Sequence, residues 1–281
     1  MAFTSWRTPR SHGEFRRSLS LERFEPTRIF DNLSMIGDNL VCCFLLETGD
    51  GLVLLDSMWP ENEEYIEDCI RKLGCDPAEL KNLIITHGHL DHFGSAWYFQ
   101  KKYGTKIWIG ENDRKYASPE YEMYRESPPG KDFSYLTCRI DETLTDGQCL
   151  DFGGTRIHCF ETPGHTPGCM SLVFQVFDEG RPHMASLWGG TGLPQCLEWR
   201  KDLLASCDRF AAVGLQYGCD AAISTHPFVD NGYERLQVLQ HIVDGVANPF
   251  VLGYEGYHRF EMMYREMYAA GIRAREAEGS R

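Results

Sequence analysis

Short apolar runs separated by turn residues fill the first part of the chain after residue 30. The runs Ser34–Ile36, Val41–Glu47 and Leu52–Asp56 alternate with polar segments that contain glycine. One of these segments, Thr48-Gly49-Asp50-Gly51, is typical of a hairpin turn. The pattern therefore predicts an antiparallel β-sheet at the start of the folded region.

The period of the pattern then becomes helical. Residues Glu61–Leu73 place apolar side chains on one face, and Gly74 follows as a helix C-cap. A continuous apolar run, Leu83–Ile85, predicts a buried strand. Another helical pattern covers Phe93–Tyr103, and Lys106–Ile109 predicts a further strand. This part of the chain thus alternates helix and strand.

The second half of the chain has a similar layout, although no sequence repeat is visible. A helix is predicted from Leu197 to Tyr217, and the chain is helical again towards a polar tail after Ala270. The apolar runs that predict strands are Cys149–Phe152, Thr155–Glu161, Cys169–Phe177, Met184–Trp188 and Ala221–Thr225. Residues 111–137 hold no period, and we expect a helix and a long loop there.

The chain of 281 residues is long enough to bury a sizeable core in one large domain or two. Residues 1–30 are mixed and interrupted by charges, which is typical of a surface arm. We expect a folded domain over residues 31–255. Residues 256–281 are then expected to form a helical tail that packs on this domain or extends it.

Charge and composition narrow the partners. The formal net charge of −13 argues against a nucleic-acid surface, because phosphate binding needs clustered Lys and Arg. The N-terminus has no apolar core of signal-peptide length and no run is long enough to span a bilayer, so we expect a soluble cytoplasmic protein with no membrane partner. The eleven cysteines form no CxxC pair, and we expect them to be reduced thiols.

The strongest chemical signal follows the strand at Leu83–Ile85. His87 and His89 are two residues apart on extended chain, so both imidazoles project from the same side. Asp91 and His92 lie in the turn at the next helix start and can face the same pocket. Three imidazoles and a carboxylate form a nitrogen and oxygen ligand set that suits zinc best, and iron or manganese less well. This segment therefore predicts a metal site.

The segment His87-Gly88-His89-Leu90-Asp91-His92 resembles the HxHxDH motif of the metallo-β-lactamase superfamily. The resemblance extends from about Ile36 to about Phe250. It implies an α/β fold, the four-layer αββα sandwich, with metals at the strand ends between the two sheets. Within this superfamily, the negative net charge disfavours the nucleases.

The resemblance supplies the remaining ligands. The loop Pro163-Gly164-His165-Thr166-Pro167-Gly168 resembles the next histidine loop of the family, with His165 at the tip of a turn fixed by proline and glycine. By resemblance, His165 completes a site with His87 and His89, and His226 completes a second site with Asp91 and His92. The other histidines are interpreted as structural or surface residues: His12, His158, His183, His241 and His258.

Two further positions are compared with the family. Asp56 resembles a strand-end Asp that supports the metal loop without binding metal, and the alternative is an Asp that caps a turn. Thr191 lies where many members have an Asp that bridges the two metals. A threonine hydroxyl is a poor zinc ligand, although it can hydrogen-bond a metal-bound water. This departure disfavours glyoxalase II, the usual lactonases, persulfide dioxygenases and flavo-di-iron proteins, and resembles the third (B3-like) subclass of metallo-β-lactamases.

The resemblance implies a zinc-dependent hydrolase that holds two Zn²⁺ ions per chain. A metal-bound hydroxide, formed near neutral pH because zinc lowers the water pKa to about 7, would attack a cyclic or linear amide or ester carbonyl. Asp91 is also the nearest proton carrier. The alternatives are a hydrolase of another acyl compound (lactone, thioester or acyl amide), a metal-binding protein without hydrolysis, and an iron oxidoreductase.

The expected partner is a small-molecule substrate, and the sequence leaves its identity and the oligomeric state open. Substrate selection would depend on loops 57–60, 111–137 and 227–233. Aromatic side chains in these loops are candidates to line the pocket, and ordinary packing is the alternative for each. The candidates are Trp59, Tyr121, Tyr124, Phe133 and Phe228.

Overall fold

A computed structural model describes residues 21–117, 138–242 and 245–279 of the chain. The first half of the sequence builds a seven-stranded sheet in which the strands are neighbours in chain order. β1 to β4 pair antiparallel, whereas β4 to β7 pair parallel. The strands are β1 (Thr27–Phe30), β2 (Leu33–Gly37), β3 (Cys42–Thr48), β4 (Gly51–Leu55), β5 (Leu80–Ile85), β6 (Lys106–Gly110) and β7 (Glu142–Leu144).

The second half builds a five-stranded sheet in the order β12-β11-β10-β9-β8. Its strands pair antiparallel except for β11 and β12, which are parallel. The strands are β8 (Cys149–Phe152), β9 (Thr155–Glu161), β10 (Met170–Asp178), β11 (Arg181–Leu187) and β12 (Ala221–Ile223). A backbone hydrogen bond of 2.8 Å from the Met170 N–H to the Thr86 carbonyl joins the start of β10, just after the His165 loop, to the residue before His87.

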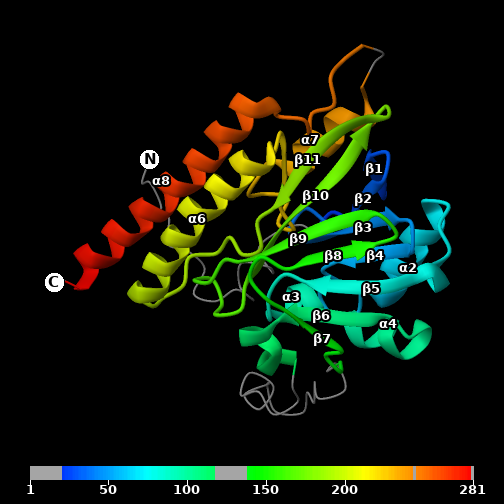
Figure 1. The fold of residues 1–281 in the computed structure, drawn as a ribbon, viewed down its shortest axis with the longest axis horizontal. Helices are drawn as coiled ribbons and strands as arrows, with labels where there is room; N and C mark the ends of the chain where they lie inside the picture. Colours follow the sequence, from blue (N-terminus) through cyan, green and yellow to red (C-terminus); the bar gives the residue numbers. More distant parts are fainter. Residues whose placement is uncertain (1–20, 118–137, 243–244, 280–281) are drawn as a thin grey trace, which may run out of the picture.

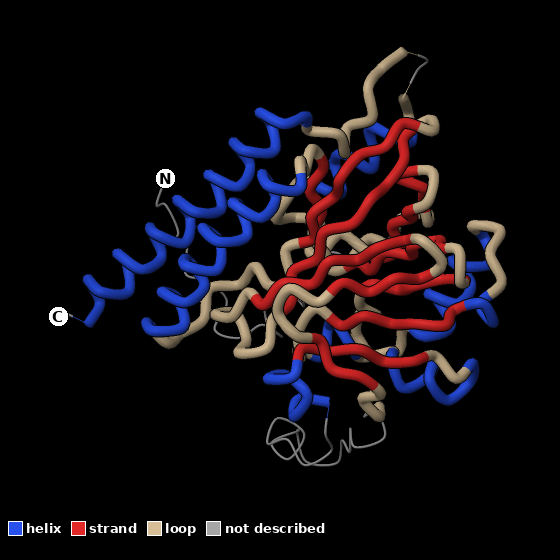
Figure 2. Tube along the Cα trace, in the orientation of Figure 1, coloured by secondary structure: helices blue, strands red, loops and turns tan. Residues whose placement is uncertain are grey.

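Helices cover the outer faces of both sheets (Figures 1 and 2). The seven-stranded sheet packs against α2 (Glu63–Lys72), α3 (Leu90–Phe93) and α4 (Ala96–Tyr103), which bury residues such as Ile66 and Phe99. The five-stranded sheet packs against α6 (Leu197–Tyr217) and α8 (Gly253–Gly279), which lie side by side. A separate apolar cluster joins the inner faces of the two sheets. The predicted α/β fold, an αββα sandwich, is confirmed.

The C-terminal helix α8 begins at Gly253, slightly before the expected tail. It contributes three buried tyrosines, Tyr257, Tyr264 and Tyr268, to the apolar cluster beneath it. This segment therefore packs on the sandwich along much of its length. The shorter helix α7 (Gly232–Gln240) precedes it.

Two local elements differ from the sequence prediction. β1 lies inside the segment expected to be an arm, yet it pairs with β2, and its Ile29 and Phe30 are buried. The helix predicted over Phe93–Tyr103 begins later, at Ala96, as α4, and Gly94 and Ser95 separate it from the short helix α3. A Cβ at Gly94 would lie 2.3 Å from Pro60, so the close approach of the Pro60 loop requires glycine at this interruption.

Among residues 21–117, 138–242 and 245–279, no helix combines the length and apolar character needed to cross a bilayer. The cysteines in this part of the chain are free thiols. Most are buried within the apolar clusters, for example Cys43, Cys159 and Cys207.

Candidate metal centre

The segment after β5 supplies four of the candidate ligands. β5 ends at Ile85, and the chain runs through Thr86 to His89, whose carbonyl accepts a 2.9 Å bond from the His92 N–H at the start of α3. The carboxyl ends of the parallel strands β4, β5 and β6 lie at one edge of the sheet. The connection β9–β10 and the ends of β11 and β12 bring further residues to this edge. The sheet topology thus gathers residues that are far apart in sequence.

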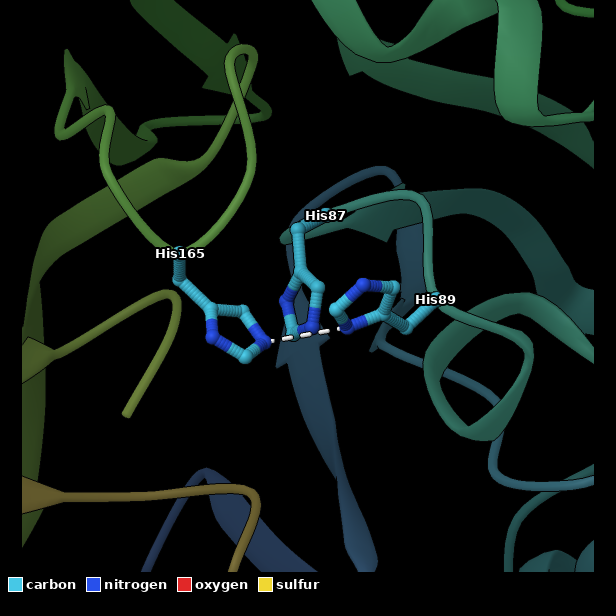
Figure 3. Close-up of side chains that lie close together, drawn as sticks. All are labelled: His87, His89 and His165. Atoms are coloured by element: carbon cyan, nitrogen blue, oxygen red, sulfur yellow. Dashed lines mark hydrogen bonds between the residues drawn. The ribbon is translucent and has the colours of Figure 1, made fainter. Parts of the chain in front are cut away.

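His87, His89 and His165 form the first candidate cluster (Figure 3). Their ligand atoms lie within 4.8 Å of one another. The Nδ1 of His89 and the Nε2 of His165 are 3.0 Å apart. A tetrahedral zinc site with Zn–N bonds of about 2.0–2.1 Å places its donors roughly 3.3 Å apart. The three imidazoles therefore have the spacing of a zinc site.

Asp91, His92 and His226 form the second candidate cluster, again with ligand atoms within 4.8 Å of one another. The Asp91 Oδ2 lies 3.6 Å from the His92 Nε2 and 3.7 Å from the His226 Nε2. The two clusters adjoin, because the rings of His87 and His92 have centroids only 3.9 Å apart. The arrangement suits a pair of neighbouring metal ions.

Hydrogen bonds fix the ring orientation of four of these histidines. In each ring the Nδ1 faces an oxygen that can only accept, so Nδ1 carries the proton and Nε2 keeps its lone pair. The pairs are His87 with the Gly189 carbonyl (2.7 Å), His165 with the Gly192 carbonyl (2.7 Å), His226 with the Leu40 carbonyl (2.9 Å) and His92 with the Asp56 carboxylate (2.7 Å).

The site fits a metal in two further respects. The Nε2 atoms of His87 and His92 are buried and have no hydrogen-bond partner among the described residues, and a metal ion would satisfy both lone pairs. Burial, followed by the neighbouring imidazoles, lowers the pKa of His87 well below its usual range, and it lowers the pKa of His165 to about 3. Both rings are therefore neutral at physiological pH, which is the form that binds metal.

Asp56 makes more contacts to the segment that carries the candidate ligands than a turn cap would. Its carboxylate is fully buried and accepts bonds from the Thr86 N–H (2.7 Å), the Thr86 hydroxyl (2.8 Å) and the His92 Nδ1 (2.7 Å). The backbone of Asp56 is left-handed, with φ of 62°. These contacts hold Thr86 at the end of β5 and orient the ring of His92.

Thr191 lies beside the first cluster in the segment that follows β11. Thr191 is mostly buried, and its carbonyl accepts a 3.3 Å bond from the Tyr268 hydroxyl of α8. The carbonyls of Gly189 and Gly192 in this segment hold His87 and His165. In the sequence, the run of glycines is the only signal of this backbone role.

The glycines of this segment are required by space. A Cβ on Gly190 would lie 2.7 Å from the Cβ of His165 and 2.9 Å from the Sγ of Cys169. A Cβ on Gly189 would lie 2.0 Å from the Met170 carbonyl oxygen. The segment therefore passes so close to the histidine loop that side chains cannot fit between them.

The candidate pocket residues have different surroundings. Trp59 is partly buried against the apolar cluster under α2 and α4, and its carbonyl accepts bonds from Asn62 and Ser95. Phe228 is 50% exposed, and its ring centroid lies 5.4 Å from that of His226, so its side chain borders the second cluster. Three candidates lie outside the described residues: Tyr121, Tyr124 and Phe133.

Three of the remaining histidines make contacts away from both clusters. His158 contacts the Tyr217 hydroxyl at 3.3 Å, and His183 pairs with Asp220 at 2.6 Å. The Nδ1 of His241 faces a carbonyl within its own helix turn. They make the structural contacts expected of them.

The model of the metallo-beta-lactamase superfamily matches residues 36–176, half of the chain. The chain belongs to this superfamily. Its fold is similar to that of a subclass B3 metallo-β-lactamase of Bradyrhizobium japonicum (25% identity, 91% of this chain, 96% of that one, TM-score 0.76). The native metallo-β-lactamase from Legionella gormanii shares the fold at 23% identity, over 92% and 99% of the two chains, with a TM-score of 0.80.

Matches among curated proteins are shorter. A probable metallo-hydrolase of Burkholderia pseudomallei is 30% identical over 107 residues, which are 38% of this chain and 35% of that protein. An N-acyl homoserine lactonase of a Bacillus species is 24% identical over 163 residues, 50% of this chain and 60% of the lactonase. The chain therefore aligns with less than two thirds of the length of these relatives.

Proposed function

We propose that this protein is a di-zinc hydrolase that cleaves an amide-type or ester-type carbonyl in a small molecule, with the site design of the third subclass of metallo-β-lactamases. The proposal is carried by the two adjoining ligand clusters, whose His87 and His92 rings are 3.9 Å apart. When bound there, zinc supplies a Lewis acid and a water of lowered pKa.

The chain's own residues position and neutralise the reacting groups. His87, His89 and His165 present neutral nitrogen donors, so the first cluster keeps a net positive charge once loaded and can stabilise a developing oxyanion. In the second cluster, Asp91 adds one negative charge beside two imidazoles. Its Oδ2 lies within 3.7 Å of both rings, which also suits a proton carrier between nucleophile and leaving group.

Thr191 supports assignment to the third subclass. Thr191 stands in the segment after β11. Among the described residues, this segment supplies no carboxylate that could bridge the two clusters. A hydroxyl at this place is suited to hold water by a hydrogen bond rather than to bind metal. The similarity in fold to a subclass B3 enzyme of Bradyrhizobium japonicum supports the same assignment.

The second candidate is hydrolysis of another acyl compound. The curated relatives include an N-acyl homoserine lactonase and a hydroxyacylglutathione hydrolase, so a lactone or a thioester is the alternative substrate. If the protein works in the cytoplasm, as we propose, this alternative gains weight, because β-lactams act outside the inner membrane. An iron oxidoreductase is disfavoured because, among the described residues, Thr191 and not a carboxylate occupies the segment after β11.

Metal content tests the site. Chelator-washed protein that is reloaded with zinc should hold two Zn²⁺ per chain by mass spectrometry. His226→Ala should lose one of them because it deletes a ligand, whereas Thr191→Ala should keep both and change the rate modestly. If Thr191→Ala loses a metal while His226→Ala keeps two, the ligand assignment is wrong.

Activity tests the substrate class. The zinc-loaded protein should hydrolyse a chromogenic cephalosporin, and a parallel panel should contain an acyl homoserine lactone and an acyl thioester. Higher kcat/KM for the lactone or the thioester supports the second candidate. Loss of every activity in the presence of two zinc ions would contradict both.

A further inference from the structure

A buried acid outside the candidate ligand set lies directly beneath the first cluster. Asp113 belongs to the 3-10 helix η2 (Glu111–Ala117), which follows β6, and its side chain is fully buried. Its carboxylate accepts three hydrogen bonds, from the Gly88 N–H (2.8 Å), the Thr166 hydroxyl (2.6 Å) and the Gly168 N–H (2.7 Å). The hydrogen-bond donors to the Asp113 carboxylate are therefore all uncharged groups.

The three donors belong to the two loops that carry the first cluster. Gly88 stands between His87 and His89, and Thr166 follows His165. The Oδ2 atom of Asp113 accepts from both loops at once, and Oδ1 takes the second bond from the His165 loop. One carboxylate thus joins two segments that are more than seventy residues apart in sequence, at the positions next to the ligands.

The contact between η2 and these loops is tight. A Cβ on Gly88 would lie 2.4 Å from the Tyr116 Cβ, and a Cβ on Gly168 would lie 2.3 Å from the Asp113 nitrogen. Only glycine lets both backbones approach the carboxylate closely enough to donate their N–H groups. The 3-10 helix η2 therefore packs directly against both histidine loops.

Burying a carboxylate costs free energy unless hydrogen bonds or an opposite charge compensate for the lost water. Burial raises the pKa of Asp113, and the three hydrogen bonds oppose that change. A carboxylate offers acceptors on both oxygens and no donor, so it satisfies two backbone N–H groups and a hydroxyl together. An amide or an apolar side chain of this size leaves at least one buried N–H without an acceptor.

We propose that Asp113 is a positioning residue that sets the distance between the His87–His89 loop and the His165 loop, and so holds the first metal cluster ready for zinc. The inference rests on the proposed function. It predicts that Asp113 controls zinc affinity at one cluster, although it contacts no ligand atom itself. The second cluster, Asp91, His92 and His226, receives no bond from Asp113.

The test measures zinc binding by chelator competition in Asp113→Asn, so its readout does not depend on turnover. We expect the dissociation constant of one zinc ion to rise about 10- to 100-fold, the range found when partners that orient metal ligands are removed. The dissociation constant of the other zinc ion should stay within about threefold of the wild-type value. Asp113→Asn in the His226→Ala background, which should hold only the first-cluster zinc, assigns the effect to a site.

Asp141→Asn is the matched control. Asp141 accepts a 3.0 Å bond from the Ile107 N–H at the opposite end of β6 and forms an ion pair with Arg139, so Asp141→Asn also removes a carboxylate charge that accepts a backbone bond, but far from the histidine loops. Its zinc affinity should match the wild type. Equal zinc affinities for Asp113→Asn and Asp141→Asn would overturn the inference.

A milder pair keeps the test valid if Asp113→Asn does not fold. Thr166→Val deletes one of the three bonds and should weaken the same zinc ion about 10-fold, whereas Thr166→Ser keeps the hydroxyl and should restore the wild-type affinity. Unchanged affinity in Thr166→Val overturns the inference while wild-type protein still binds two zinc ions. Wild-type protein that binds no zinc overturns the proposed function itself.

Discussion

Asp56→Asn isolates the role of one charge in the second cluster. Asn tolerates the left-handed backbone that Asp56 adopts, with φ of 62°, so the substitution keeps the turn. It changes only what the side chain offers. The carboxylate accepts from the Thr86 N–H through Oδ1, and from the Thr86 hydroxyl and the His92 Nδ1 through Oδ2.

The magnitude follows from the geometry at His92. If the amide oxygen keeps the Thr86 N–H, the amide NH₂ faces the Nδ1–H of His92, and two donors meet. His92 must then lose this bond or move its proton to Nε2, which removes the lone pair that would bind metal. Hydrogen bonds to charged groups contribute about 1.5–3 kcal/mol. A loss of about 2 kcal/mol corresponds to roughly 30-fold weaker zinc binding at the second cluster.

Stepwise zinc titration against a chelator measures this effect. One dissociation constant should rise about 30-fold in Asp56→Asn, within the range of about 10- to 100-fold known for partners of metal-bound histidines. Asp76→Asn is the control, because Asp76 caps the Ala78 N–H on the surface and Asn caps equally well. Two unchanged zinc constants in Asp56→Asn would refute the proposed role of the His92–Asp56 bond.

Two further predictions concern space and burial. Gly190→Ala should weaken zinc binding at the first cluster and destabilise the fold by about 1–3 kcal/mol, because the added Cβ would lie 2.7 Å from the Cβ of His165. Zinc titration and urea unfolding measure the two effects. Wild-type values in both would contradict the tight packing. Burial raises the pKa of Glu261 to about 7, so wild-type stability should fall as pH rises from about 4.5 to 7. Glu261→Gln should therefore melt at least about 4 °C higher than wild type at pH 8 and no higher at pH 4, and equal melting temperatures at both values would show that Glu261 is not buried as a neutral acid.

The candidate ligands could be predicted because their signal is local. His87, His89, Asp91 and His92 lie within six residues after an apolar run, and His165 lies in a turn marked by proline and glycine. The apolar periods also predicted most strands and the long helix α6. β1 was missed because its four residues, Thr27–Phe30, are too short to show a period.

The residues that orient the ligands could not be predicted in the same way. The Nδ1 of His226 bonds the Leu40 carbonyl across 186 positions, and the Nδ1 of His87 bonds the Gly189 carbonyl across 102. A backbone carbonyl has no identity in the sequence, so no residue type marks these partners. Asp113 is an ordinary acid in a polar segment, and only the fold shows that it is fully buried.

The architecture of the sandwich explains why some candidate ligands and the groups that orient them are far apart in the sequence. Ligand-bearing loops from both halves of the chain meet at one edge of the sandwich, and two of the histidines are held by backbone from the other half. His87 of the first half is held by Gly189 of the second, and His226 of the second half is held by Leu40 of the first. The acceptors of His92 and His165 lie within their own halves. Both candidate clusters nevertheless depend on the packing of the two sheets, because each contains one histidine whose acceptor lies in the opposite half. Zinc affinity should for this reason report on the packing of the two sheets as sensitively as on the ligands.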